Sequence, residues 1–202
     1  MISDDGPDPL RNFSSHEQKT LTAALRQLTT EIHEGLWSSV PLSTNLIRQI
    51  HSRFFSGVRD HAGRIRERDW GDEYLTFGPH RSVSRRDVVA ELDEMFSLLM
   101  RSARSLADNP DHPGYEEAAY RTAIWAHAKL IRIHPFEDGN GRTARAFLNV
   151  LLVRFGLRPV AMEMCRTEYI ALLNEYFESG LRDIQRLIDG ILRLAAEQAT
   201  TG

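Results

Sequence analysis

The sequence predicts one all-α domain of about seven or eight helices that carries one short β-hairpin. Three observations indicate this class. Apolar residues recur three or four positions apart along most of the 202 residues, a spacing typical of amphipathic helices. Glycine and proline interrupt that spacing where one helix should end and the next begin. Only residues 58–83 lose the helical period altogether.

The N-terminal part is predicted to be an acidic tail followed by one helix. Residues 1–12 are rich in aspartate, glycine and proline, a composition typical of a mobile tail. Ser14 and Glu17 have the spacing of a capping box, in which two side chains bond to the N–H groups at a helix start. Leucine and isoleucine follow at helical spacing, and Gly35 ends the segment. We expect a first helix within residues 13–35.

Residues 36–202 are predicted to form the main domain. A second helix begins near Ser43 and ends at Gly57. In residues 58–83, glycines and aromatic residues favour a short extended hairpin. This segment is rich in arginine, and its composition alone leaves a solvated loop and a functional surface about equally open. The remaining helices are expected over residues 84–106, 118–131, 141–156, 167–179 and 182–198.

Composition argues against several classes of protein. Lysine and arginine number 25 against 28 aspartates and glutamates, so the net charge of −3 disfavours a positive coat for duplex nucleic acid. Cys165 is the one cysteine, which excludes an intramolecular disulfide and disfavours a structural zinc site. No apolar run approaches the roughly 18 residues of a membrane span. The N-terminus lacks a signal-peptide core. We expect a cytoplasmic protein that binds neither nucleic acid nor membrane.

A short segment after the fourth expected helix has the composition of an anion site. Gly139-Asn140-Gly141 allows backbone N–H groups to turn toward one point, because glycine reaches positive φ angles. A helix begins there, and its positive N-terminal end faces the same point. Arg142 and Arg145 are neighbours on the first turn of that helix and add positive charge. The segment predicts a seat for a polyphosphate.

Two neighbouring residues extend this prediction to catalysis. Asp138 offers the hard carboxylate oxygen that Mg²⁺ prefers beside phosphates. His134 precedes the seat and can act as a general base near neutral pH. An anion-friendly helix start with a structural histidine is the competing interpretation. The segment is neither a P-loop nor a dinucleotide fingerprint. Together, the residue types favour phosphate-ester chemistry on a nucleotide.

Residues 134–145, HPFEDGNGRTAR, match the Fic-family signature H-P-F-x-[DE]-G-N-G-R-x-x-R at all nine specified positions. The chain is similar to this family from about Ile47 to Ile191. The resemblance implies a Fic-type helical domain and a protein adenylyltransferase, an AMPylator. Such an enzyme moves AMP from ATP to a Ser, Thr or Tyr hydroxyl of a target protein and releases pyrophosphate. ATP as substrate and Mg²⁺ as cofactor follow from the same resemblance.

The resemblance also implies roles for individual residues of the motif. His134 would take the proton of the target hydroxyl as it attacks the α-phosphorus. Asp138 would hold Mg²⁺ between the α- and β-phosphates. Phe136 would point into the core and hold the shape of the loop, and Pro135 would stiffen it. The phosphates would be cradled and contacted by Gly139, Asn140, Gly141, Arg142 and Arg145, with Arg145 at the γ end.

Outside the motif, the resemblance implies a docking segment and a residue near the base. The hairpin at about residues 66–83 corresponds to the family's flap, which would dock the target protein by strand addition beside His134. Tyr169 lies where the family often has a tyrosine near adenine, although a packed core residue is an equally good interpretation. We interpret His127 as a packed structural histidine.

The first expected helix also contains a candidate inhibitory element. Thr30, Glu34 and Gly35 fit the pattern [ST]-x-x-x-E-[GN] of an inhibitory helix, in the position that it has in the N-terminally inhibited class. Glu34 would form a salt bridge with Arg145 and block the γ-phosphate position. The competing interpretation is a helix C-cap with an incidental glutamate. Residues 13–35 are thus expected to form an inhibitory helix in front of the Fic domain, residues 36–202.

Other activities remain open on the sequence alone. Relatives with this fold also transfer a phosphate or a phosphocholine group, or remove AMP from the target. A non-catalytic ATP-binding regulatory module is a further alternative, although such a module would not need His134. A DNA-binding regulator is disfavoured because residues before Gly35 supply one helix only. Auto-modification and a homodimer are compatible with the sequence.

Overall fold

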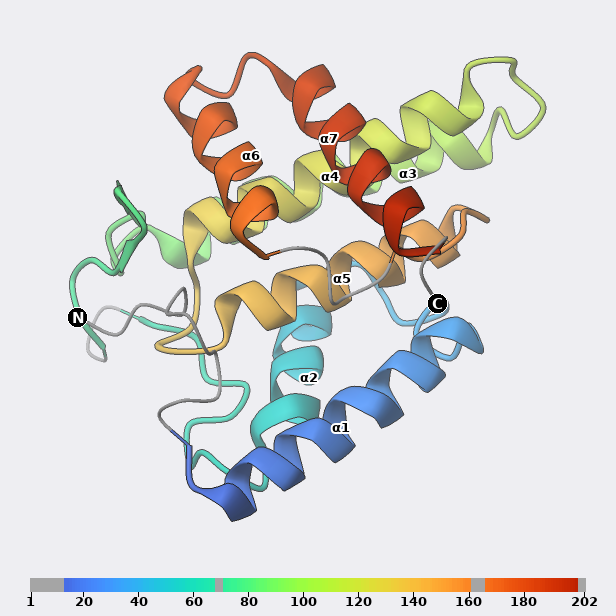
Figure 1. The fold of residues 1–202 in the computed structure, drawn as a ribbon. Helices are drawn as coiled ribbons and strands as arrows, with labels where there is room; N and C mark the ends of the chain where they lie inside the picture. The colour runs from blue at the N-terminus through green and yellow to red at the C-terminus, as the bar shows by residue number, and fades with distance from the viewer. Residues whose placement is uncertain (1–12, 68–70, 161–165, 200–202) are drawn as a thin grey trace.

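The computed structural model describes residues 13–67, 71–160 and 166–199. Within these ranges the chain forms seven α-helices and one two-stranded antiparallel hairpin (Figure 1), which confirms the predicted fold class. The tail predicted for residues 1–12 lies outside the described residues. The elements are α1 (Ser15–His33), α2 (Thr44–Phe55), β1 (Thr76–Phe77), β2 (His80–Arg81), α3 (Val88–Ala107), α4 (Tyr115–Ile133), α5 (Asn140–Arg154), α6 (Arg166–Glu178) and α7 (Ile184–Ala199).

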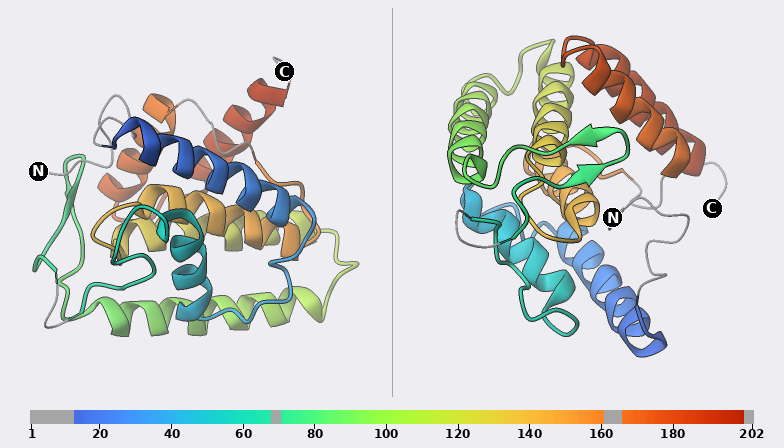
Figure 2. Two further views of the ribbon diagram at one scale, coloured as in Figure 1. Left: turned by 90° about the horizontal axis from the view of Figure 1, so that it is seen from below. Right: turned by 90° about the vertical axis from the view of Figure 1, so that its left-hand side faces the viewer.

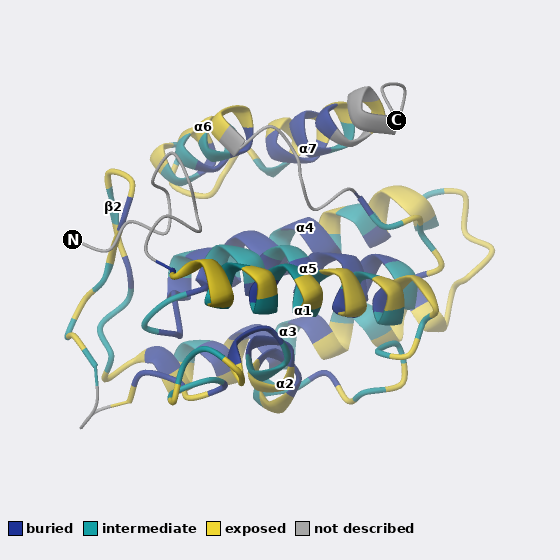
Figure 3. Ribbon diagram, turned by 60° about the horizontal axis from the view of Figure 1, so that its bottom comes forward, coloured by how far each residue is buried: buried dark blue, intermediate teal, exposed yellow. Residues whose placement is uncertain are grey.

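Two adjacent helices, α4 and α5, form the centre of the molecule. α5 packs against α4 on one side and against α1 and α2 on the other, while α3 and α7 also pack on α4. Ten of the fifteen residues of α5 are buried, on every face of the helix. Buried residues accordingly face the space between the helices, and exposed ones face outward (Figure 3). The loop that joins α4 to α5 is thereby fixed at both of its ends.

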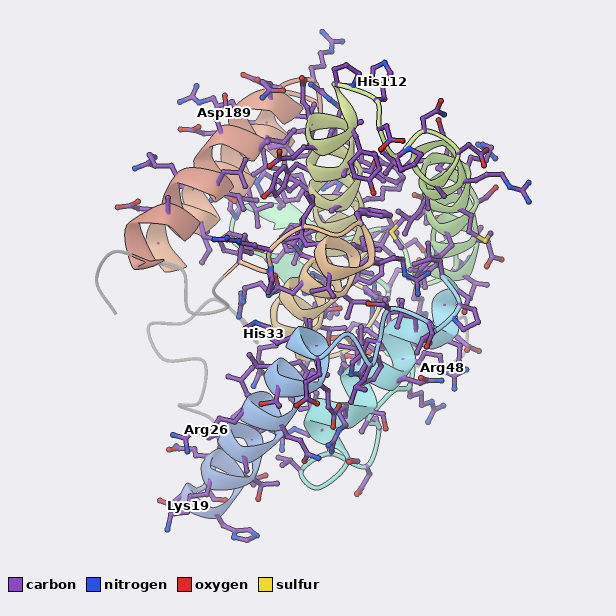
Figure 4. All side chains as sticks on the ribbon, turned by 90° about the vertical axis from the view of Figure 1, so that its right-hand side faces the viewer. Lys19, Arg26, His33, Arg48, His112 and Asp189 are labelled. Carbon is purple, nitrogen blue, oxygen red and sulfur yellow. The ribbon has the colours of Figure 1, made fainter. Side chains whose placement is uncertain are left out.

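α1 lies alongside α5 and runs in the same direction (Figures 1 and 2). The capping box is present at its start, where the Ser14 hydroxyl accepts from the Glu17 N–H at 3.3 Å and the Glu17 carboxylate accepts from the Ser14 N–H at 2.7 Å. Its apolar face, which includes Leu28, belongs to the same core as the other helices. Its polar face carries Lys19 and Arg26, which point away from the molecule (Figure 4).

The hairpin lies beside the end of α4. Phe77 pairs with His80 and Thr76 with Arg81, so the turn consists of Gly78 and Pro79. A hairpin is therefore present within residues 66–83, as predicted, and each of its strands is two residues long.

Among the described residues, no helix is long and apolar enough to cross a membrane.

Candidate active site

The loop between α4 and α5 is shaped by two left-handed residues and one asparagine. His134 has φ 55° and Gly139 has φ 74°, so the chain turns sharply at each end of the loop. The Asn140 side chain accepts from the Phe136 N–H at 2.9 Å and donates to the Phe136 carbonyl at 2.7 Å. The amide side chain of Asn140 is therefore engaged within the loop. The contact with phosphates that we predicted for Asn140 would therefore be made by its backbone N–H.

The imidazole of His134 is buried and has a defined orientation. Its Nδ1 lies 3.1 Å from the Ile131 carbonyl, to which it donates a hydrogen bond. In the neutral ring, this places the lone pair on Nε2, which is the form that a general base needs. The ring also stacks on Phe77 of the hairpin, with 4.8 Å between centroids and an interplanar angle of 6°.

A pocket opens beside this ring, and its volume is about 420 Å³ when the part open to solvent is included. Its wall is mostly apolar, and the charged group on it is Arg145 of α5. Helix α6 supplies one side, so the cavity lies between the motif, the hairpin and α6. The lining residues are Phe77, Ile131, His134, Gly141, Arg145, Tyr169, Ile170, Leu173, Asn174 and Phe177. Such a cavity suits a flat, partly apolar ligand with a charged end.

Asp138 and Arg142 form an ion pair at the start of α5. The Nη2 atom of Arg142 lies 3.5 Å from Oδ1 of Asp138, and the same oxygen accepts from the Gly139 N–H at 2.6 Å. The guanidinium of Arg142 also lies 4.7 Å from the ring centre of Phe55 and 5.4 Å from that of Phe13. The two predicted phosphate and metal residues are thus neighbours, and both are largely buried.

The donor set around Asp138 fits Mg²⁺ only if phosphate oxygens complete it. No three His, Cys, Asp or Glu side chains gather into a metal-binding group in the described parts of the chain. Glu137 faces away from Asp138, because its carboxylate accepts from the Asp72 N–H at 3.2 Å. One carboxylate with phosphate oxygens is a usual environment for Mg²⁺. The site therefore fits a cation that arrives with a nucleotide.

Arg145 rests on a buried pair of side chains. Its guanidinium lies 5.7 Å from the ring centre of Tyr169, whose hydroxyl donates to Nε2 of His127 at 2.6 Å. Nδ1 of His127 donates to the Ala144 carbonyl at 2.9 Å. Burial lowers the pKa of His127 to about 4, and nearby Arg145 acts in the same direction, so this ring is neutral. His127 is packed, as predicted, and Tyr169 is a buried residue that supports Arg145.

Two residues that support the loop were not identified from the sequence. The buried ring of His51 stacks on Phe136 at 4.0 Å, accepts from the Gly63 N–H on Nδ1 at 2.8 Å, and donates from Nε2 to the Asp138 carbonyl at 3.0 Å. Arg66, predicted only as part of the hairpin segment, is fully buried. The one available signal for His51 was its place on the apolar face of α2, four residues before Phe55.

Glu34 does not meet Arg145. The end of α1 lies by the far end of α5, where the Arg154 guanidinium donates to the backbone carbonyls of Trp37 and Val40. Glu34 is exposed and caps α1, and Gly35 follows with φ 75°. The Thr30 hydroxyl donates to the Arg26 carbonyl within the helix. The predicted salt bridge between Glu34 and Arg145 is wrong, because the start of α1 lies by the motif and the end of α1 does not. Glu34 instead forms the C-cap of α1, as in the competing interpretation.

Comparison with known proteins gives matches over most of the chain. A family model described as Fic/DOC family matches residues 41–152. The protein adenylyltransferase fic-1 of Caenorhabditis elegans is 46% identical over 183 residues, which cover 89% of this chain and 33% of that protein. The protein adenylyltransferase Fic of Drosophila melanogaster is 45% identical over 158 residues, covering 78% and 29%. The chain thus spans about a third of the length of these curated relatives.

Solved structures show the same arrangement of helices. A fragment of Fic-1 from C. elegans superimposes with a TM-score of 0.62 at 25% identity, covering 95% of this chain and 55% of that one. The N-terminal FIC domain of Bep8 from Bartonella sp. 1-1C gives a TM-score of 0.65 at 16% identity, covering 96% of each chain. The second likeness bears on the fold alone.

Proposed function

The chain belongs to the Fic/DOC family, and from that premise we propose that it is a protein adenylyltransferase. It transfers the adenylyl group of ATP to a Ser, Thr or Tyr hydroxyl of a target protein. The observation that carries the proposal is the placement of His134. Its Nδ1 is engaged by the Ile131 carbonyl, and its ring lines the same cavity as Arg145. A site that only bound ATP would not need a base there.

In the transfer step, the target oxygen forms a bond to the α-phosphorus as the bond from that phosphorus to the β-bridging oxygen breaks. His134 accepts the hydroxyl proton on Nε2, and pyrophosphate leaves with the electron pair of the broken bond. The N-terminal end of α5 supplies N–H groups and a positive dipole for the charge that develops. Arg142 and Arg145 extend that positive field along the helix.

Asp138 would hold Mg²⁺, which would neutralise phosphate charge and orient the leaving group. The chain's own contribution is to keep Asp138 in place. Its backbone carbonyl is bound by His51, and its side chain is held by the Gly139 N–H. Phosphates bound to the Arg142 guanidinium would compete with its 3.5 Å ion pair to Asp138 and leave that carboxylate able to hold a cation.

The target protein would dock on the hairpin at residues 66–83. In the described part of this segment two strands pair, so their outer edges carry N–H and C=O groups with which an extended segment can pair. Phe77, which stacks on His134, places this edge next to the base. Strand addition would therefore carry a target hydroxyl toward Nε2. The same geometry allows a segment of a second copy to be modified.

The proposal is tested with ATP labelled on the α-phosphate or on the γ-phosphate. We expect transfer of the α-label alone to a target protein or to the chain itself, with an AMP adduct in the mass spectrum. His134→Ala should abolish that transfer while ATP binding persists. A phosphate adduct, or transfer of the γ-label, would contradict adenylyl transfer. Release of AMP from a pre-modified target would instead favour the reverse reaction.

A further inference from the structure

The guanidinium of Arg66 is fully buried and binds oxygens from three separate segments of the chain. In addition, the Arg66 backbone N–H donates to the Pro135 carbonyl at 2.8 Å. The side-chain bonds run from Nε to the His134 carbonyl at 2.9 Å, from Nη1 to the Asp72 carbonyl at 3.0 Å, and from Nη2 to Ser82 Oγ at 3.1 Å, the Val83 carbonyl at 3.2 Å and the Ile133 carbonyl at 3.4 Å.

These acceptors are main-chain carbonyls and one hydroxyl. A buried charge is tolerated only when its donors are satisfied, and here five acceptors surround them. Burial lowers the pKa of Arg66, whereas the carboxylates of Glu137 and Asp72 act in the opposite direction. Two of the carbonyls belong to the end of α4, where the helix dipole favours a cation. The surroundings of Arg66 are therefore built for a charged, planar group.

On the motif side, Arg66 binds three consecutive peptide carbonyls, those of residues 133, 134 and 135. They flank His134, whose φ of 55° and ψ of 61° are unfavourable for a residue with a Cβ atom. Such a conformation persists only where surrounding contacts hold it. Since these peptide planes fix the Cα–Cβ direction, Arg66 constrains the point and direction from which the His134 side chain leaves the backbone.

On the hairpin side, the same guanidinium binds both arms of the segment. Asp72 precedes β1, and Ser82 and Val83 follow β2. Glu137 of the motif makes a second link to the Asp72 N–H. Gly71 is required for that link, because a Cβ atom there would lie 1.8 Å from Oε1 of Glu137. Arg66 and Glu137 thus connect the residues that flank β1 and β2 to the motif loop.

We propose that Arg66 is the positioning residue that fixes the catalytic base and the target-docking hairpin relative to each other. It acts through His134 and touches no substrate. The catalytic consequence rests on the proposed adenylyl transfer, but the positioning itself does not. A lysine at this position would keep the charge and lose the planar fork that spans both segments.

The main experiment compares Arg66→Lys with the control Arg154→Lys. Arg154 is a partly buried arginine that likewise donates to main-chain carbonyls, but it lies at the opposite end of α5. We expect Arg66→Lys to lower kcat for transfer by about 100-fold, as misplacement of a base by about 1 Å does, with the Kd for ATP unchanged. Arg154→Lys should lower the melting temperature with kcat unchanged. Equal kcat values for the two variants would overturn the proposal.

A second readout does not depend on transfer. The ring proton signals of His134, assigned by their loss in His134→Ala, should shift or broaden in Arg66→Lys and stay in place in Arg154→Lys. Hydrogen exchange over residues 71–83 should rise in Arg66→Lys and stay unchanged in Arg154→Lys. Unmoved signals and unchanged exchange in folded Arg66→Lys would overturn the proposal. A wild-type chain that transfers no AMP would overturn the proposed function and leave this test standing.

If Arg66→Lys does not fold, Ser82→Ala takes its place. This variant removes the hydroxyl that accepts from Arg66 and from the Leu75 N–H, at 3.1 Å and 2.9 Å. It should raise exchange in the hairpin and reduce kcat with no change in the Kd for ATP. An unchanged kcat together with unchanged exchange would again contradict the proposal.

Discussion

Gly139→Ala should destabilise the fold and disable the site at once. Gly139 has φ 74°, a left-handed conformation that costs a residue with a Cβ atom about 1–2 kcal/mol. The new Cβ would also lie 2.3 Å and 2.4 Å from two ring carbons of Phe55. Since carbon atoms pack at about 3.5–4.0 Å, the ring must move by about 1 Å or more. Overpacking of this kind costs about 1–3 kcal/mol.

The two contributions together predict that the free energy of unfolding falls by about 2–5 kcal/mol. Denaturant unfolding followed by circular dichroism measures it. Gly156→Ala is a matched control, because Gly156 has φ 73° but a Cβ atom added there would meet nothing within 4 Å. That variant should lose only about 1–2 kcal/mol. The difference between the two isolates the steric conflict with Phe55.

The functional effect follows from what Phe55 supports. Its ring stacks on His51 at 4.6 Å and lies below the Arg142 guanidinium at 4.7 Å. A displaced ring therefore moves both His51, which binds the Asp138 carbonyl, and Arg142, which we propose binds phosphate. We expect adenylyl transfer by Gly139→Ala to fall by about 100-fold. Equal destabilisation of the Gly139 and Gly156 variants, with transfer retained, would refute this reasoning.

Three further outcomes are expected. Glu34→Gly should leave transfer of labelled AMP unchanged, because Glu34 is exposed at the far end of α5; a marked rise in transfer would restore the inhibitory role. The pKa of His127 is lowered from 6.5 to about 4, so between these pH values the unfolded state binds more protons than the folded state. The free energy of unfolding should therefore fall as the pH drops from 6.5 to 4, by up to about 3 kcal/mol. Unfolding of His127→Gln across that range should show a flatter dependence. Tyr169→Phe loses the 2.6 Å bond to His127, so it should lose about 1–2 kcal/mol of stability and keep its Kd for ATP; weaker ATP binding would place the hydroxyl on the adenine side.

The parts that were predictable from the sequence are those determined by neighbours in the chain. The capping box at Ser14 and Glu17 starts α1 as expected, because its two partners are three residues apart. The motif loop is likewise local, since Asn140 bonds to Phe136 and Asp138 to Gly139. Helix count and hairpin follow from apolar spacing and glycine placement for the same reason.

The parts that were not predictable depend on partners far along the chain. His51 binds the Asp138 carbonyl 87 residues away, and Arg66 binds the His134 carbonyl 68 residues away. The error over Glu34 has a related cause. A pattern within α1 shows where a glutamate lies on that helix, but the direction in which α1 packs along α5 is a property of the assembled core. Phe13, just before the start of α1, lies near Arg142, so it is the start of α1 and not its end that approaches the motif.

The site lies between two helix ends of opposite polarity, and this explains why a cation is buried at Arg66. The carbonyl end of α4 carries partial negative charge, and the N–H end of α5 carries partial positive charge. Both ends flank the loop at residues 134–139, so an uncompensated α4 end would oppose the anion that α5 attracts. Arg66 binds the carbonyls of Ile133 and His134 and cancels that charge. The buried charge of Arg66, which we propose positions His134, would therefore also keep the field positive at the proposed phosphate seat.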